Sequence, residues 1–279
     1  MRSGIIATVP LGWLLLASII LIAAGFGVGW LLAYRRKLDR EQAHHLPESQ
    51  QQELPYLQMM RALGHELRTP LTAVIGHMEI IASCQIEERE MWMRSLNIVT
   101  SETERLERLV TEFLNLSRLE MEPAYMRTIN LRLAAEEAIS MLFDLAQANS
   151  VTLGLETPPH LPRVKGDKDR LQQVFLNLIE NGIKYAPGEA VTVQMHPDGA
   201  ERVYVAVWDT GPGIPAADIP HIFEPFYRVN QTKASPGTGL GLAIVKSILE
   251  QHGTVIVAQS QPGQGSRFSF LLPTAVNAP

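Results

Sequence analysis

The chain has little cysteine, no excess of positive charge and only one long hydrophobic run. Its 279 residues include one cysteine, Cys84, so an internal disulfide and a metal cage of several cysteines are excluded. We expect Cys84 to be a buried or half-buried small apolar residue. The 24 basic and 29 acidic residues give a formal net charge of −5, which argues against a general nucleic-acid binder. A hydrophobic content of 46% is ordinary for a globular chain and too low for a polytopic membrane protein.

The single long hydrophobic run covers residues 11–33 and contains no charged side chain. At about 1.5 Å per helical residue it spans roughly 34 Å, which is enough to cross a bilayer core of about 30 Å. Trp13 and Trp30 lie near its two ends, where an interfacial aromatic belt would place them. A cleaved signal peptide is the alternative, but the run is too long for one, and Arg35-Arg36-Lys37 follows it like a stop-transfer signal. We therefore expect a single transmembrane helix over residues 11–33.

The charges on the two sides of this run differ. The basic residues at 35, 36, 37 and 40 outweigh Arg2, so the positive-inside rule places the chain after residue 34 in the cytoplasm. This predicts a single-pass protein of the cell (cytoplasmic or inner) membrane with a short extracytoplasmic N-terminus, residues 1–10. Gly25 and Gly29 are spaced to let two such helices approach closely, or are simply tolerated there; both interpretations remain open. Residues 34–54 are charged and Gln-rich, and we expect a juxtamembrane linker.

Two helical patterns follow within residues 55–122, and in both the apolar positions alternate spacings of four and three. The first comprises Met60, Gly64, Leu67, Leu71, Val74, Met78 and Ile81, and the second Trp92, Leu96, Val99, Thr103, Leu106, Val110 and Phe113. Such seams are typical of coiled coils, and the short link around 83–88 predicts antiparallel neighbours. One hairpin has too little core to stand alone. We therefore expect two hairpins to pair into a four-helix bundle, which makes the protein a homodimer.

The first helix carries the sequence His65-Glu66-Leu67-Arg68-Thr69-Pro70. His65 is a titratable nucleophile beside the carboxylate of Glu66, and Thr69 lies one turn beyond His65 on the same face. Pro70 cannot donate the backbone hydrogen bond of a helix interior, so we expect a bend just past this group. His65 lies two positions from Leu67, about 200° around the helix, so it faces away from the seam.

Pro123 closes the hairpin region, and residues 128–275 mix strands with helices. We expect helices at 131–148, 169–185 and 239–252, and strands at 151–156, 191–195 and 203–208, with two further strands near 255 and 268. Asp198-Gly199 predicts a hairpin turn between two of these strands. Mixed strands with helices gathered on one face indicate an α/β sandwich of about 150 residues.

Two clusters in this second domain combine side chains suited to a nucleotide. Asn177, Asn181 and Lys184 recur at spacings of four and three, so they share one helix face. An amide oxygen is a neutral hard ligand that suits Mg²⁺ when phosphates supply the negative charge, and Lys184 adds a cation. Asp209-Thr210-Gly211-Pro212-Gly213 follows a predicted strand. Its aspartate can accept a hydrogen bond from an exocyclic amine such as that of adenine, and its glycines let backbone and ligand come close.

Two further clusters suggest a lid and a phosphate site. Phe223-Glu224-Pro225-Phe226-Tyr227-Arg228 opens a polar segment that runs to Pro236, which indicates a mobile lid with an aromatic hinge. Gly237-Thr238-Gly239-Leu240-Gly241-Leu242 leads into a helix, and Gly-rich backbone at a helix N-terminus binds phosphate readily. Each cluster alone is weak, and the usual dinucleotide fingerprint would follow the first strand of a βαβ unit.

All four clusters, in this order and with a His-Glu helix upstream, resemble a membrane-bound sensor histidine kinase of two-component systems. The resemblance covers residues 55–275. His65 to Leu71 is similar to the phosphoacceptor box of the HisKA-type dimerisation domain. The four later clusters are similar to the N, G1, F and G2 boxes of the HATPase_c or GHKL ATP-binding domain. Gly182 departs from the pattern, where alanine is commoner, and we expect it only to loosen the helix locally.

The resemblance implies ATP-dependent autophosphorylation of His65 and transfer to an aspartate of a response regulator, with Mg²⁺ as cofactor. It implies that Asn181 holds Mg²⁺, Asp209 reads adenine, Glu66 acts as acid or base, and Thr69 supports dephosphorylation of the regulator. The implied nucleotide-binding set is Asn177, Asn181, Lys184, Tyr185, Asp209, Gly211, Gly213, Phe223, Phe226, Arg228, Gly237, Gly239, Gly241 and Leu242. The implied partners are a receiver domain, a second copy of the chain and the membrane, with a membrane protein that supplies the signal as a further possibility and no direct nucleic-acid contact.

Three other functions are weighed against this interpretation. ATPases of the same fold, like the type II topoisomerases, place a general-base glutamate four residues before the Mg²⁺-binding asparagine. Here Asn177 occupies that position, and we expect Glu180 to face elsewhere. Serine kinases of the anti-sigma type lack a phosphoacceptor helix. A pseudokinase scaffold that only sequesters a regulator is distinguished by its nucleotide affinity. The stimulus, and phosphorylation within or between subunits, are not readable from the sequence.

Overall fold

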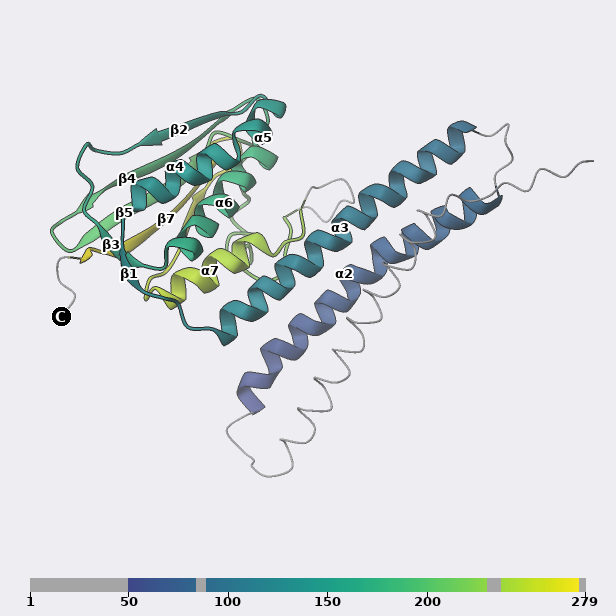
Figure 1. Cartoon of the computed structure of the whole chain (residues 1–279), viewed down its shortest axis with the longest axis horizontal. Helices are drawn as coiled ribbons and strands as arrows, with labels where there is room; N and C mark the ends of the chain where they lie inside the picture. Colours follow the sequence, from purple (N-terminus) through teal and green to yellow (C-terminus); the bar gives the residue numbers. More distant parts are fainter. Residues whose placement is uncertain (1–49, 84–88, 230–236, 276–279) are drawn as a thin grey trace, which may run out of the picture. The chain divides into compact units, whose positions relative to one another are not determined.

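The computed structural model describes residues 50–83, 89–229 and 237–275 (Figure 1). The expected transmembrane helix, most of the juxtamembrane linker and Cys84 lie outside these residues. No helix within the described ranges is both long and apolar enough to cross a membrane. The chain divides into two compact units, Met1–Gln58 and Met59–Pro279, and the features below belong to the second, apart from residues 50–58 at the start of the first long helix.

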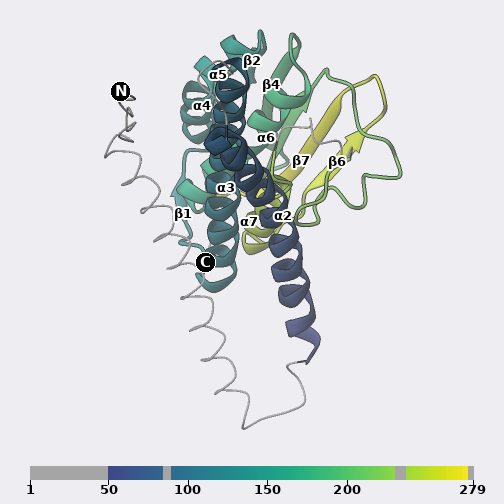
Figure 2. The ribbon, with the colours of Figure 1, turned by 90° about the vertical axis from the view of Figure 1, so that its right-hand side faces the viewer.

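Two long helices form the expected hairpin. Helix α2 spans Gln50–Ser83 and helix α3 spans Arg89–Met121, and they lie side by side (Figures 1 and 2). His77 Nδ1 lies 3.2 Å from the Ser95 hydroxyl, and Glu66 pairs with Arg105. Because the later residue of α2 meets the earlier residue of α3, the helices are antiparallel. Helix α2 continues as α-helix through Pro70.

The predicted seams of this hairpin are only partly covered within one chain. Phe113 is buried, but Leu71, Met78 and Val110 remain 51%, 50% and 43% exposed. These three positions belong to the coiled-coil pattern of the sequence. One copy of the hairpin therefore presents an apolar strip along its length.

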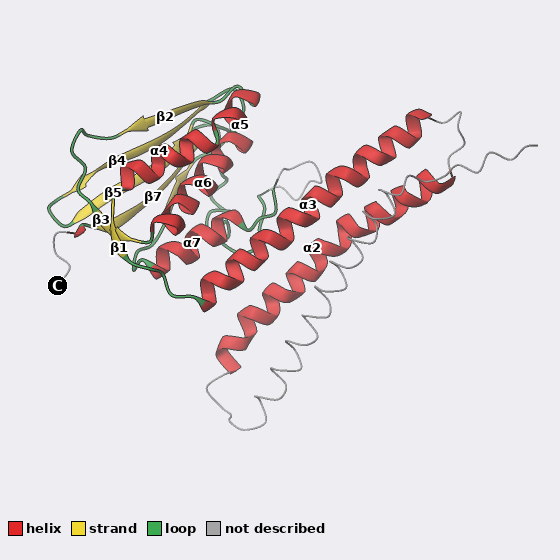
Figure 3. Ribbon diagram, viewed as in Figure 1, coloured by secondary structure: helices red, strands yellow, loops and turns green. Residues whose placement is uncertain are grey.

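The remaining elements build an α/β sandwich. Its main sheet has the order β2-β4-β5-β7-β6, with β2 and β4 parallel and the other neighbours antiparallel. The strands are β2 Thr152–Glu156, β4 Ala190–Asp198, β5 Arg202–Asp209, β6 Val257–Ser260 and β7 Ser266–Pro273. The helices are α4 Leu131–Met141, α5 Phe143–Ala148, α6 Lys168–Tyr185 and α7 Gly241–Gln251. A small antiparallel pair joins β1 Arg127–Ile129 to β3 Val164–Gly166. Helices α4, α6 and α7 lie together on one face of the sheet (Figure 3), which confirms the expected layering.

The helix expected at 131–148 is in fact two helices. The break falls at Leu142, whose N–H bonds to the carbonyls of both Ala138 and Ile139. This mixed bonding is the pattern of a helix end, where α and 3₁₀ turns compete. Because the apolar periodicity of the sequence continues through Leu142, the sequence does not indicate this break.

Helix α6 is the element that positions the site. Its N-terminus is capped by Asp167, whose side chain accepts the Arg170 N–H at 3.3 Å. Its buried face, Leu171, Val174, Phe175, Leu178, Ile179 and Ile183, packs into the core beside the sheet. Asn177, Asn181 and Lys184 fall on another face, as their spacing predicts. The packing of the apolar face therefore fixes the direction of these three polar side chains.

Gly182 contributes to this packing. A Cβ at Gly182 would lie 2.6 Å from Val191 Cγ2 and 2.9 Å from Val191 Cγ1 on strand β4. Such contacts are closer than side chains tolerate, and the β-branched valine has little freedom to turn away. The expectation that Gly182 only loosens the helix is therefore wrong, because the missing methyl makes room for Val191.

The start of α6 is tied to the end of α7 by His252. Its Nδ1 donates to the Ile248 carbonyl at 2.7 Å, and its Nε2 accepts the Asp167 N–H at 3.0 Å. Burial lowers the pKa of His252, and the nearby Arg170 acts in the same direction. The neutral ring thus satisfies both bonds at this junction.

Candidate nucleotide site

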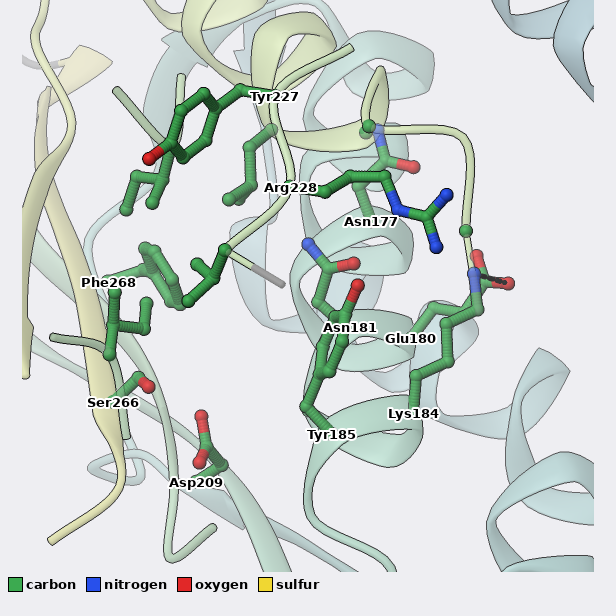
Figure 4. Close-up of a pocket in the computed structure, with 18 of the residues that line it drawn as sticks. Asn177, Glu180, Asn181, Lys184, Tyr185, Asp209, Tyr227, Arg228, Ser266 and Phe268 are labelled. Atoms are coloured by element: carbon green, nitrogen blue, oxygen red, sulfur yellow. Dashed lines mark ion pairs between the residues drawn. The ribbon is translucent and has the colours of Figure 1, made fainter. Parts of the chain in front are cut away.

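A cavity of about 590 Å³ lies beside α6, at the end of β5 and before the N-terminus of α7. Its size falls in the range of small-molecule sites, about 300–1,000 Å³. The expected residues that line it are Asn177, Asn181, Lys184, Tyr185, Asp209, Gly213, Arg228, Gly237, Gly239, Gly241 and Leu242. Figure 4 shows Asp209 and Ser266 at one end, Asn177, Arg228 and Lys184 at the other, and Asn181 between them. The four sequence clusters therefore meet in one cavity.

Asp209 forms the first end. Burial raises the pKa of its carboxyl group, while hydrogen bonds from the Gly211 N–H and from the backbone and hydroxyl of Ser266 lower it. The Gly211 N–H donates to Oδ1 at 2.9 Å. Asp209 and Ser266 are direct partners in the register of β5 and β7, which explains why they meet. A half-buried carboxylate fixed by neighbouring donors is suited to accept a hydrogen bond from an exocyclic amine.

Helix α6 supplies the opposite end. The Asn177 Oδ1 accepts from the Gln173 Nε2 at 3.2 Å, and the Asn177 Nδ2 is buried without a partner in the described structure. That orphaned N–H₂ group can donate to an oxygen of a ligand. Lys184 Nζ lies 2.9 Å from Glu180 Oε1, and both line the cavity. The expectation that Glu180 faces elsewhere is wrong, because it lies three positions after Asn177 and so shares that side of the helix.

The amide groups also decide how a metal could be held. The Asn177 oxygen accepts a hydrogen bond from Gln173, whereas no such bond is made by the Asn181 oxygen among the described contacts, and Asn181 also lines the cavity. In the described part of the chain, no group of three or more His, Cys, Asp and Glu side chains could hold a metal ion. The residues fit a Mg²⁺ that takes one amide oxygen from Asn181 and its remaining ligands from phosphates and water.

The glycine-rich segment before α7 is fixed by the aromatic cluster. The Phe226 N–H donates to the Gly239 carbonyl at 2.9 Å, and both residues have positive φ, +65° and +79°. A Cβ on Gly239 would lie 2.7 Å from the Phe226 backbone, so only glycine fits. Phe223 packs edge-to-face against Phe268, with the ring centroids 6.4 Å apart. Three expected residues, Gly211, Phe223 and Phe226, do not line the cavity and instead support its wall from behind. The expected lid residues 230–236 lie outside the described residues.

The phosphoacceptor candidates lie on α2, away from this lining. His65 and Thr69 are exposed, whereas Glu66 is half-buried. Glu66 Oε2 lies 3.4 Å from Arg105 Nη2, and Arg105 Nη1 lies 3.7 Å from Glu102 Oε2. That His65 faces away from the seam stays a prediction, because the seam residues Leu71 and Met78 are also exposed in one chain. Glu66, however, is paired with α3 and not with the imidazole beside it.

Two family models match this chain. Residues 56–122 match the His Kinase A (phospho-acceptor) domain, and residues 166–276 match the histidine kinase-, DNA gyrase B- and HSP90-like ATPase. The chain belongs to the sensor histidine kinases. Its relatives include the sensor histidine kinase ZraS of Klebsiella oxytoca, 33% identical over 92% of this chain and 54% of ZraS. WalK of Bacillus subtilis is 34% identical over 76% of this chain and 35% of WalK. This histidine kinase thus spans about half the length or less of these curated relatives.

Solved structures agree with this histidine kinase in fold. The histidine kinase ThkA in complex with the response regulator protein TrrA has a TM-score of 0.66 at 25% identity, over 86% of this chain and 66% of that one. Full-length ShkA in complex with AMPPNP has a TM-score of 0.56 at 26% identity, over 78% of this chain and 46% of that one. The helical hairpin and the GHKL-type ATPase domain are the shared parts.

Sequence reasoning missed several residues of the kinase's cavity. Ser266 and Phe268 enter through strand β7, and the sequence gives no signal of them because the register of β7 with β5 joins distant segments. Glu112 comes from α3 of the hairpin, and the Thr238 hydroxyl donates to its Oε2. Burial raises the pKa of Glu112, which the Thr238 bond and Lys184 partly offset. No local signal marks Glu112 in the sequence, because charged residues are common on such helices.

Proposed function

We propose that this chain is an ATP-dependent protein-histidine kinase that phosphorylates its own His65 and passes the phosphoryl group to an aspartate of a response regulator. One observation carries the proposal: the same chain has an exposed histidine next to a carboxylate on α2 and a cavity in which all four predicted clusters meet. The ShkA complex with AMPPNP and the ThkA complex with TrrA support the nucleotide and the partner.

The cavity would bind ATP by its two ends. Asp209 would accept the adenine amine, and Lys184, the free amide of Asn177 and the glycine-rich segment would hold the phosphates. Mg²⁺ held by Asn181 would neutralise charge on the transferring phosphoryl group. Tyr185, Arg228 and Leu242 would complete the walls.

The chemistry would take place at an imidazole nitrogen of His65. The neutral nitrogen attacks the γ-phosphorus, the bond to the bridging oxygen breaks, and ADP leaves. Glu66 would take the proton from the other ring nitrogen, and its pairing with Arg105 through Oε2 leaves its second oxygen for this role. His65 is not among the residues that line the cavity, so transfer requires the ATPase domain to approach His65 of the same or a second copy.

The proposal also covers the oligomeric state of the enzyme and its attachment to the membrane. The apolar strip on α2 and α3 supports a homodimer in which two hairpins form a four-helix bundle. The composition of residues 11–33 supports a single-pass anchor in the cell membrane, with the kinase domains in the cytoplasm. Thr69, exposed one turn after His65, would support phosphatase activity toward the regulator.

The test is incorporation of ³²P from labelled ATP. We expect His65→Gln to abolish acid-labile, base-stable label while AMPPNP affinity stays unchanged, since His65 does not line the cavity. Label retained in this variant would overturn the assignment. Steady ATP turnover without any labelled protein would instead favour a plain ATPase, for which Glu180 in the cavity is the candidate base.

A further inference from the structure

The nucleotide cavity contains one carboxylate that the ATPase domain does not supply. Glu112 belongs to α3, and its side chain lines the cavity together with Lys184, Thr238 and Gly239. The Thr238 hydroxyl donates to Glu112 Oε2, and the Leu240 N–H donates to the Thr238 oxygen at 3.2 Å. Glu112 is thus connected through Thr238 to the N-terminus of α7.

The N-terminus of α7 also favours the binding of anions. Helix α7 begins at Gly241, directly after the glycine-rich segment, and its first N–H groups carry the positive end of the helix dipole. Lys184 is the cation on the facing side of the cavity, and it interacts electrostatically with Glu112. A carboxylate held between these groups occupies the surroundings that phosphate oxygens require.

The positive charge at this end of the cavity is too small to stabilise both the Glu112 carboxylate and the phosphates of a nucleotide. Lys184 already pairs with Glu180 at 2.9 Å, so two carboxylates, Glu112 and Glu180, share one ammonium group. A bound triphosphate would add more negative charge at this end of the cavity. Like charges at such distances in a partly buried site repel by about 1 kcal/mol or more.

We infer that Glu112 is an internal competitor of the nucleotide's phosphates: it occupies the phosphate end of the cavity and must leave Thr238 when ATP binds. The inference rests on the proposed binding of ATP in this cavity and adds a residue of the phosphoacceptor hairpin to the determinants of nucleotide affinity. It also couples two parts of the molecule. Helices α3 and α7 are in contact, so phosphate binding removes one of the bonds that hold the hairpin against the ATPase domain.

The experiment compares two probes by calorimetry on the 279-residue chain with Mg²⁺ present. Glu112→Ala and Glu112→Gln should each bind AMPPNP about tenfold more tightly than the original chain, which corresponds to about 1.4 kcal/mol. Glutamine keeps the size and an acceptor oxygen, so it removes only the charge. Adenosine, which has no phosphates, should bind all three chains equally.

Glu107→Ala is the matched control, because Glu107 is an exposed glutamate on the same helix and does not line the cavity. It should leave both affinities unchanged. Equal AMPPNP affinity in Glu112→Gln and the original chain would overturn the inference, as would an equal gain for adenosine. An original chain that binds neither probe would overturn the proposed nucleotide site itself, so the two failures are distinguishable.

Discussion

The residues around His65 have different surroundings, although they follow one another on α2. Glu66 is half-buried and paired with Arg105, so its position depends on the opposite helix. Thr69 is exposed on the side of His65, where a docked partner can reach it. The carboxylate therefore belongs to the internal contacts of the hairpin, and the hydroxyl faces outward.

This difference makes the two directions of the reaction separable. Replacing Thr69 by Ala should leave autophosphorylation of His65 within about twofold, while dephosphorylation of the regulator falls by about a hundredfold, as expected when a positioned polar group is lost. Autophosphorylation and regulator dephosphorylation are measured on the same preparation. Equal loss of both activities would indicate that Thr69 has only a structural role, and Thr69→Ser should restore the phosphatase.

His252 predicts a pH dependence of stability. Its folded pKa is lowered, so below its unfolded value of about 6.5 the unfolded chain takes up a proton that the folded chain resists. The free energy of unfolding should therefore fall as the pH drops from about 6.5 toward the folded pKa, by up to about 1.4 kcal/mol per pH unit. Urea unfolding at pH 7.5 and 5.5 measures this.

The control for His252 is His252→Gln, whose amide can accept the Asp167 N–H without titrating. The variant should lose less stability than the original chain over the same pH step. An identical pH dependence in both chains would assign the acid sensitivity to other groups.

At the scale of elements, the contact between α6 and β4 sets a strict limit on side-chain size. Gly182→Ala should destabilise the domain by about 1–3 kcal/mol, because the new methyl overlaps Val191. The double variant with Val191→Ala should be more stable than the sum of the two single effects, by about 1 kcal/mol. Urea unfolding of the four chains gives this coupling.

Gly76 provides the matched helical control. A Cβ there meets nothing within 4 Å, so Gly76→Ala in α2 should be neutral or stabilising, by up to about 1 kcal/mol from helix propensity. If Gly182→Ala behaved like Gly76→Ala, the proposed overlap with Val191 would be absent.

Most elements could be predicted from the sequence because their signals are local. The sequence indicated α6 and α7 to within about two residues, the apolar seams marked α2 and α3 but not their full length, and alternation with a turn indicated the β4–β5 hairpin. The break at Leu142 could not be predicted, since the amphipathic pattern runs through it. The parallel pairing of β2 with β4 also depends on a long crossover that no local pattern specifies.

The candidate site was predictable where its residues belong to one element. Asn177, Asn181 and Lys184 share a helix face by spacing alone, and Asp209 was marked by its glycine turn. Glu112 and Ser266 reach the cavity through tertiary contacts with distant segments, which a single sequence does not reveal. The orientation of Glu180 was mispredicted although helical geometry was sufficient to place it.

At the scale of the whole molecule, the apolar strip on the hairpin predicts the assembly. Met78→Glu places a charge at a position that is half exposed in one chain and would be covered in a four-helix bundle. Sedimentation should show a larger monomer fraction, with AMPPNP affinity unchanged because Met78 does not line the cavity. Glu79→Gln, at an exposed neighbour, is the control, and a dimer unaffected by Met78→Glu would place the interface elsewhere.

The bond between Phe226 and Gly239 has a consequence for how such a chain can vary. It holds the two ends of the intervening segment together from the cavity side, independently of what lies between them. Closing a longer flexible loop between fixed ends costs only about 0.6 kcal/mol per doubling of its length. The fold should therefore tolerate added residues between Arg228 and Gly237, because the Phe226–Gly239 bond keeps both ends at the wall of the nucleotide site.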